Sequence, residues 1–126
     1  MKIQNFLNNR INSFSYAFKG IWIAISSQTN VKIHLSTIFP IIGLGLFFKI
    51  SLSEWIAIII CIGMVISAEI MNTSIEFLTD LVSPEFHPQA GKVKDLAAGA
   101  VLAIAFTALI VGGIIFFPKI WISLSG

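Results

Sequence analysis

The chain has 126 residues, of which 56% are hydrophobic and only 11% are charged. Globular proteins contain about 45–50% apolar and about 25% charged residues, so this composition excludes intrinsic disorder and argues against a soluble domain. A net charge of +2 and a single cysteine, Cys61, exclude a nucleic-acid binder that relies on phosphate contacts, a disulfide framework and a cysteine-based zinc site. The composition predicts a small membrane protein. The helical patterns along the chain, without internal repeats or low-complexity linkers, predict an all-α fold in a single domain, 1–126.

The first thirty residues predict an amphipathic helix that lies in the plane of the membrane surface. Apolar residues recur there at three- and four-residue spacing, while Asn9, Asn12, Ser13 and Lys19 occupy the other side. A signal peptide is the main alternative, but the segment lacks an uninterrupted apolar run followed by a small-residue cleavage site. We therefore expect residues 1–30 to form a surface helix.

Three stretches without Lys, Arg, Asp or Glu follow this segment and predict three transmembrane helices. They run from Ile33 to Phe48, from Trp55 to Ala68 and from Leu96 to Pro118. A bilayer core about 30 Å thick needs roughly 20 helical residues, and lysines at the ends of a span can reach toward water. With their flanks, the three transmembrane helices are expected at about 31–50, 53–82 and 94–118.

The second stretch is too short for a full span, and this places carboxylates at membrane depth. If the helix begins near Trp55, Glu69 lies about 21 Å along its axis, inside the apolar layer and near its far boundary. Glu76 lies about 31 Å along the axis, level with that boundary. A helix that ends before Glu69 is the alternative, but no glycine or proline interrupts the chain from Glu69 to Val82. One long helix is therefore favoured.

Polar side chains form a single stripe on the last part of this helix. Helical spacing places Glu69, Asn72, Thr73, Glu76 and Asp80 within an arc of about 100°. Carboxylate and amide oxygens are the hard ligands that Mg²⁺ prefers, and ionisable groups at membrane depth usually face a bundle interior or a wet cavity. The stripe therefore predicts a metal or catalytic site, with a merely solvated helix end as the alternative.

Basic residues near the start of the third span complement the acidic stripe. Lys92 and Lys94 lie close to the expected N-terminus of that helix, where free N–H groups and the helix dipole favour anions. Acidic metal ligands that face an anion site are the arrangement that phosphoryl transfer needs. The chain contains no P-loop or kinase glycine-rich loop, which excludes the soluble nucleotide-binding folds.

The distribution of basic residues predicts the orientation of the chain. Six of the eight Lys and Arg residues lie on the side of the N-terminus and of the connection between the second and third spans. The other two, Lys49 and Lys119, lie on the opposite side. The positive-inside rule therefore places the N-terminus and the connection from Glu69 to Asp95 on the cytoplasmic side, with the C-terminus outside.

Two motifs resemble the signatures of the prokaryotic diacylglycerol kinase family, which includes the undecaprenol kinases. The run from Glu69 to Glu76, with Asp80 four residues later, resembles the pattern E-x-x-N-[TS]-[AS]-I-E-x-x-x-D. Segments 84–88 and 94–101 resemble the second signature, and the likeness covers nearly the whole chain. The resemblance implies a small homotrimeric lipid kinase of the bacterial inner (cytoplasmic) membrane. Its reaction would move the γ-phosphoryl group of Mg-ATP to a lipid alcohol, either diacylglycerol or undecaprenol.

The resemblance also implies roles for individual residues. Glu69 is similar to the general base that accepts the proton of the lipid hydroxyl, and Glu76 with Asn72 and Gln28 is similar to the Mg²⁺ ligands. The nucleotide-contacting positions correspond to Tyr16, Gln28, Glu76, Glu85, Phe86, His87, Lys94 and Asp95. The lipid-contacting positions correspond to Arg10, Asn30, Val31, Lys32, Ile33, His34, Lys49, Ile50, Ser51, Glu69 and Ala98.

Two positions depart from the family pattern. Gln28 stands where the family has a second metal-binding glutamate, so an amide oxygen replaces a charged carboxylate. Either Mg²⁺ affinity is lower here or a neighbouring acid such as Asp80 compensates. Asn9 aligns with a substrate-contacting arginine, and Arg10 is one residue, or about 100° of helix, away from that position.

Two other classes of function are compatible with the same residues. A small proton- or cation-coupled membrane carrier could use Glu69 and Glu76 as a relay, although it would leave the Lys94–Asp95 anion site without a role. A structural or regulatory membrane subunit, including an inactive relative of the kinases, would tolerate alanine throughout the stripe. The two motifs together favour the lipid kinase over both alternatives.

Overall fold

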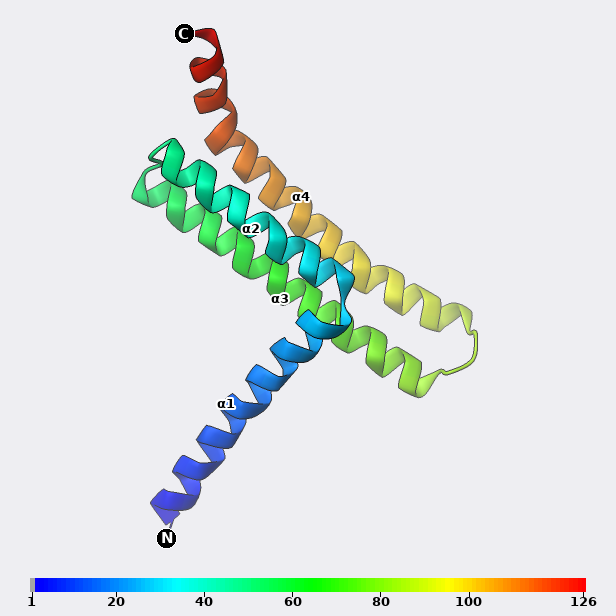
Figure 1. Ribbon diagram of the computed structural model, residues 1–126. Helices are drawn as coiled ribbons and strands as arrows, with labels where there is room; N and C mark the ends of the chain where they lie inside the picture. The colour runs from blue at the N-terminus through cyan, green and yellow to red at the C-terminus, as the bar shows by residue number, and fades with distance from the viewer. Residues whose placement is uncertain (1) are drawn as a thin grey trace.

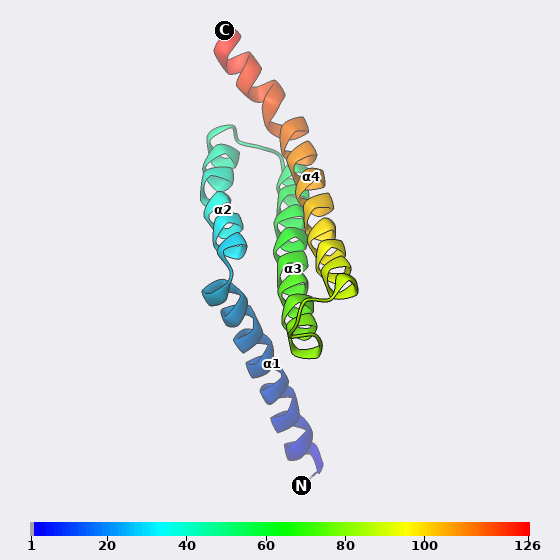
Figure 2. The same cartoon turned by 90° about the vertical axis from the view of Figure 1, so that its right-hand side faces the viewer.

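The computed structural model describes residues 2–126, and this part of the chain forms four helices. Helix α1 spans Lys2–Ser27, α2 spans Thr29–Phe47, α3 spans Leu52–Val82 and α4 spans Pro88–Ser125. Figures 1 and 2 show α2, α3 and α4 side by side in a bundle, from which α1 extends away. Helices α2, α3 and α4 are each long and apolar enough to cross a membrane. The predicted all-α fold with three transmembrane helices is confirmed.

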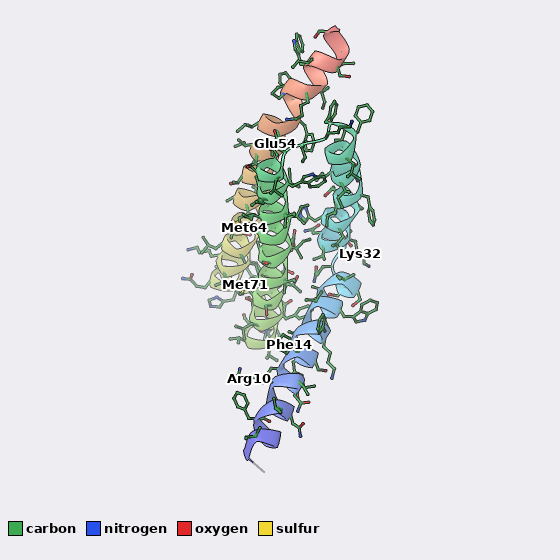
Figure 3. The ribbon with its side chains drawn as sticks, turned by 90° about the vertical axis from the view of Figure 1, so that its left-hand side faces the viewer. Arg10, Phe14, Lys32, Glu54, Met64 and Met71 are labelled. Atoms are coloured by element: carbon green, nitrogen blue, oxygen red, sulfur yellow. The ribbon has the colours of Figure 1, made fainter. Side chains whose placement is uncertain are left out.

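Helix α1 corresponds to the predicted surface helix, of which Met1 lies outside the described residues. Its apolar side chains Ile11 and Phe14 are exposed, and among its described side chains only Ala24 is buried. Figure 3 shows Arg10 and Phe14 on the part of α1 that extends away from the bundle. A helix whose apolar side chains are mostly exposed is suited to the membrane interface.

The predicted surface helix ends earlier than residue 30, because the chain bends at Gln28. The backbone of Gln28 is extended, with φ −108° and ψ 120°, and this residue is the N-cap of α2. Thr29 and Asn30 therefore belong to α2 and not to α1. This short junction places Gln28 where the surface helix meets the bundle.

A capping box starts helix α3 after the turn that follows α2. The Ser51 hydroxyl accepts a hydrogen bond from the backbone N–H of Glu54, and the Glu54 carboxylate accepts one from the backbone N–H of Ser51 at 2.7 Å. These two bonds satisfy N–H groups that have no partner within the helix. The helix then continues unbroken past Glu69 to Val82.

Helix α4 is longer at both ends than the predicted span of 94–118. Its first residue is Pro88. Proline lacks a backbone N–H, and at the first position of a helix this costs no hydrogen bond because the N–H there has no acceptor within the helix. His87 Nδ1 accepts a hydrogen bond of 3.1 Å from the backbone N–H of Gln89 and caps this end. Figure 1 shows the C-terminal turns of α4 extending beyond the α2–α3 turn. A helix can continue past the bilayer, so the length of its apolar stretch is shorter than the helix itself.

An ion pair joins α3 to α4 at the end of the bundle that carries the α2–α3 turn. Lys119 Nζ lies 2.5 Å from Glu54 Oε1, and Figure 3 shows Glu54 at this end. The buried apolar cluster lies beside the pair and contains Ile50, Ile58, Ile115 and Phe116. Pairing of the two charges lowers the cost of keeping them at a membrane boundary.

Gly45 allows the indole ring of Trp55 on α3 to lie directly against α2. A Cβ atom on Gly45 would lie 2.6 Å from Cη2 and 2.7 Å from Cζ2 of Trp55. A Cβ atom on Gly43, in the same helix, would meet nothing within 4 Å. The two glycines therefore form a matched pair for testing the contact between these helices.

Gly45→Ala is expected to lower the free energy of unfolding by about 1–3 kcal/mol, because the added methyl group must displace the Trp55 ring from a filled space. Gly43→Ala should be neutral or slightly stabilising, since alanine favours the helix and its methyl group meets open space. Thermal unfolding of both variants in detergent micelles measures the difference. Equal melting temperatures for the two variants would contradict the close contact.

Candidate active site

Glu69 is buried in α3, and its carboxylate faces His34 of α2. Only 2% of the residue is exposed, and Glu69 Oε1 lies 3.1 Å from His34 Nε2. The hydroxyl of Thr73 donates to the backbone carbonyl of Glu69 at 2.9 Å, so it does not engage the carboxylate. The predicted general base is therefore removed from bulk water and contacts an imidazole.

A cavity of about 280 Å³ opens beside this pair, between α2, α3 and α4. Five residues expected at the lipid site line it: Asn30, Ile33, His34, Glu69 and Ala98. Three residues that were not expected at the site complete the lining: Val101, Leu102 and Ala105. Their spacing from Ala98 follows one helix face, and this periodicity is the signal that could have found them.

A second cavity, of about 450 Å³, lies further along the bundle toward the α2–α3 turn. Apolar side chains of α2, α3 and α4 form nearly all of its lining. The two cavities share His34 and Ala105, so they adjoin each other. An amphiphile could therefore place a polar group beside Glu69 and a hydrocarbon chain in the apolar cavity. The sequence patterns do not predict this apolar volume.

Asn72 and Glu76 provide oxygen atoms suited to a hard cation. Asn72 Nδ2 donates to Glu76 Oε1 at 3.2 Å, while Asn72 Oδ1 is buried and has no hydrogen-bond partner. A buried acceptor without a partner is costly, and amide and carboxylate oxygens are both ligands that Mg²⁺ accepts. The pair therefore fits a magnesium ion. Within residues 2–126, no three His, Cys, Asp or Glu side chains come together as a complete metal site.

Gln28, the third expected metal ligand, lies half-buried at the junction of α1 and α2. Its side chain makes no capping hydrogen bond to α2, so the helix end leaves its amide oxygen available. The Asp80 carboxylate, the acid expected to compensate for the missing glutamate, forms an ion pair with Lys94 of α4. In this structure Asp80 is thus paired with a lysine of the neighbouring helix, and its role as a compensating ligand stays a prediction.

The expected nucleotide site is partly assembled at the α3–α4 loop. A cavity of about 240 Å³ lies there, and its lining includes Glu85, Phe86, His87 and Lys94. Phe86 is 95% exposed, so its ring is accessible to a planar ligand. Asp95 is exposed on α4 and is not part of this lining.

Two other expected site residues, Arg10 and Tyr16, lie on α1 and line none of the three cavities. Arg10 lies 5.0 Å from the centre of the Phe6 ring, and Lys19 lies 5.6 Å from the centre of the Tyr16 ring. Both cations thus contact aromatic rings of their own helix. The fold of one chain does not bring α1 to the acidic stripe at these positions.

Several expected lipid contacts lie elsewhere than beside Glu69. Ser51 lies about 27 Å from Glu69 along the axis of α3. Lys49 and Ile50 adjoin Ser51 in the α2–α3 turn, and Ile50 is buried in the apolar cluster. Val31 is fully buried, whereas Lys32 is exposed. These residues line none of the three cavities.

Comparison with known proteins agrees with the two motifs. The family model for prokaryotic diacylglycerol kinase matches residues 15–116. An undecaprenol kinase from Bacillus subtilis is 37% identical over 117 residues, which cover 93% of this chain and 95% of the relative. A diacylglycerol kinase from Synechocystis sp. is 34% identical over 89% of this chain and 65% of the relative. A diacylglycerol kinase from Haemophilus influenzae is 28% identical over 88% of this chain and 95% of the relative. The chain belongs to the prokaryotic diacylglycerol kinase family.

Proposed function

We propose that this protein is a membrane lipid kinase that transfers the γ-phosphoryl group of ATP to the hydroxyl group of a lipid alcohol. The observation that carries the proposal is the buried carboxylate of Glu69 beside a cavity that adjoins an apolar one. Family membership supports it, because relatives are named for diacylglycerol and undecaprenol, both of which are lipid alcohols. The carrier alternative receives no support from these relatives.

Glu69 is the group best placed to activate the lipid. Its carboxylate accepts the proton of the lipid hydroxyl while the hydroxyl oxygen forms a bond to the γ-phosphorus atom. The bond between the γ-phosphorus and the bridging oxygen of ATP breaks, and ADP leaves with that oxygen. The adjoining apolar cavity accommodates hydrocarbon and keeps water, a competing acceptor, away from the reacting groups.

The remaining parts of the site fit Mg-ATP. Asn72 and Glu76 would hold Mg²⁺ together with Gln28, and the ion would neutralise charge on the phosphate oxygens when bound. Lys94 would exchange its carboxylate partner Asp80 for a phosphate group. The exposed ring of Phe86 and the loop around it would contact the nucleotide.

We further propose that the chain acts as a homotrimer in the bacterial inner membrane, with the site on the cytoplasmic side. Gly99, Ala103 and Thr107 are exposed on one side of α4, and small residues at this spacing allow membrane helices to approach closely. A second copy would also offer its α1, whose Tyr16 lies apart from the acidic stripe within one chain. The distribution of Lys and Arg supports the cytoplasmic side.

The direct test is a kinase assay of purified protein in mixed micelles with labelled Mg-ATP. Diacylglycerol and undecaprenol are supplied separately, and labelled lipid phosphate is expected from at least one of them. Undecaprenol is the expected better acceptor, because the Bacillus subtilis relative carries that name. Folded protein that labels neither lipid would contradict the proposal. Cation flux into proteoliposomes without ATP would favour a carrier instead.

A further inference from the structure

We infer that His34 is a positioning residue for the general base: its Nε2–H group donates to Glu69 Oε1 and orients the other carboxylate oxygen toward the lipid hydroxyl. The inference rests on the proposed kinase function and adds a role to a residue that the family resemblance assigns only to lipid contact. The contact joins two helices through residues 35 positions apart, at an Nε2–Oε1 distance of 3.1 Å.

Burial makes this contact important for the carboxylate. The Glu69 side chain is 3% exposed and the His34 side chain is 28% exposed, so Glu69 depends on protein donors much more than His34 does. A buried carboxylate without a donor is strongly disfavoured. The imidazole of His34 therefore supplies a hydrogen bond that water cannot easily supply at this depth.

Neighbouring polar groups are already engaged elsewhere. The Thr73 hydroxyl donates to the backbone carbonyl of Glu69, and the Thr37 hydroxyl donates to the backbone carbonyl of His34 at 2.7 Å. Asn72 donates its amide N–H to Glu76. Among the described residues, His34 is thus the side chain that lies within hydrogen-bond distance of the Glu69 carboxylate.

The geometry leaves one carboxylate oxygen for chemistry. Oε1 faces the imidazole, whereas Oε2 makes no hydrogen bond within the described chain. Both residues line the cavity of about 280 Å³, and His34 also lines the apolar cavity that adjoins it. Because a glutamate side chain rotates about three bonds, a donor fixed on a second helix restricts the carboxylate to orientations in which Oε2 can meet a substrate.

The test compares three substitutions that differ in where they place a donor. His34→Leu removes the donor and keeps an apolar side chain of useful size. His34→Gln places an amide N–H near the position of Nε2, whereas His34→Asn places it near that of Nδ1. We expect His34→Leu and His34→Asn to lower kcat by about 10–100-fold with KM for ATP and lipid unchanged, because misplacement of a reacting group by about 1 Å can cost about 100-fold. His34→Gln should recover most of the lost rate.

Two results would overturn the inference. One is full activity of His34→Leu or His34→Asn. The other is an increase in KM for the lipid with kcat unchanged, which would assign His34 to substrate binding alone. If His34→Leu fails to fold, as judged by thermal unfolding, the contrast between His34→Gln and His34→Asn decides: equal kcat values for these two would reject the role. Wild-type protein that labels no lipid would instead reject the kinase function itself, so the two failures are distinguishable.

Discussion

Glu69→Gln is expected to lower the rate of lipid phosphorylation by about 10²–10⁴-fold, the usual contribution of a general base. Glutamine has nearly the same shape as glutamate, and its amide oxygen can still accept a hydrogen bond from His34. It cannot take up the proton of the lipid hydroxyl. The loss should therefore appear in kcat, with KM for lipid and for ATP little changed, in the labelled-ATP assay.

Glu54→Gln is the matched control, because it makes the same substitution in the same helix at the opposite end of the bundle. It removes the charge that pairs with Lys119, so a lower melting temperature is expected while kcat stays near the wild-type value. Loss of activity confined to Glu69→Gln would separate chemistry from stability. A Glu69→Gln rate above a tenth of the wild-type rate would contradict the role of Glu69 as the base.

The sequence was sufficient for the membrane helices and for the polar stripe, because both depend on local patterns. Gaps between charged residues mark the spans, and helical periodicity places Glu69 and Glu76 on one face. The depth of Glu69 and Glu76 in the membrane could also be predicted, since distance along a helix follows from the residue count. The structure accordingly has α3 running without a break past Glu69 to Val82.

Contacts between helices could not be predicted in the same way. Periodicity leaves the rotation of α2 relative to α3 undetermined, so the pairing of His34 with Glu69 emerged only from the structure. For the same reason the ion pair of Asp80 with Lys94, which joins α3 to α4, does not follow from the spacing of residues on α3. The sequence determines which face of its own helix a charged group occupies. The packing of the helices determines which residue it contacts on another helix.

Glu76→Gln is expected to raise the Mg²⁺ concentration needed for half-maximal activity by about 100-fold. Loss of a residue that merely supports a metal ligand costs about 10–100-fold in affinity, and a charged ligand should cost at least as much. The substitution leaves Asn72, whose buried Oδ1 has no partner, beside a neutral amide. Initial rates measured over a Mg²⁺ titration test this expectation, and an unchanged requirement would remove Glu76 from the metal site.

The reciprocal change, Gln28→Glu, should lower the same Mg²⁺ requirement, because a charged carboxylate binds a hard cation more strongly than an amide oxygen. Ser123→Glu adds an equal charge to an exposed position near the end of α4 and controls for the change in net charge. If only Gln28→Glu shifts the titration, the junction of α1 and α2 contributes to the metal site. Identical titrations for both variants and the wild type would mean that position 28 does not touch the ion.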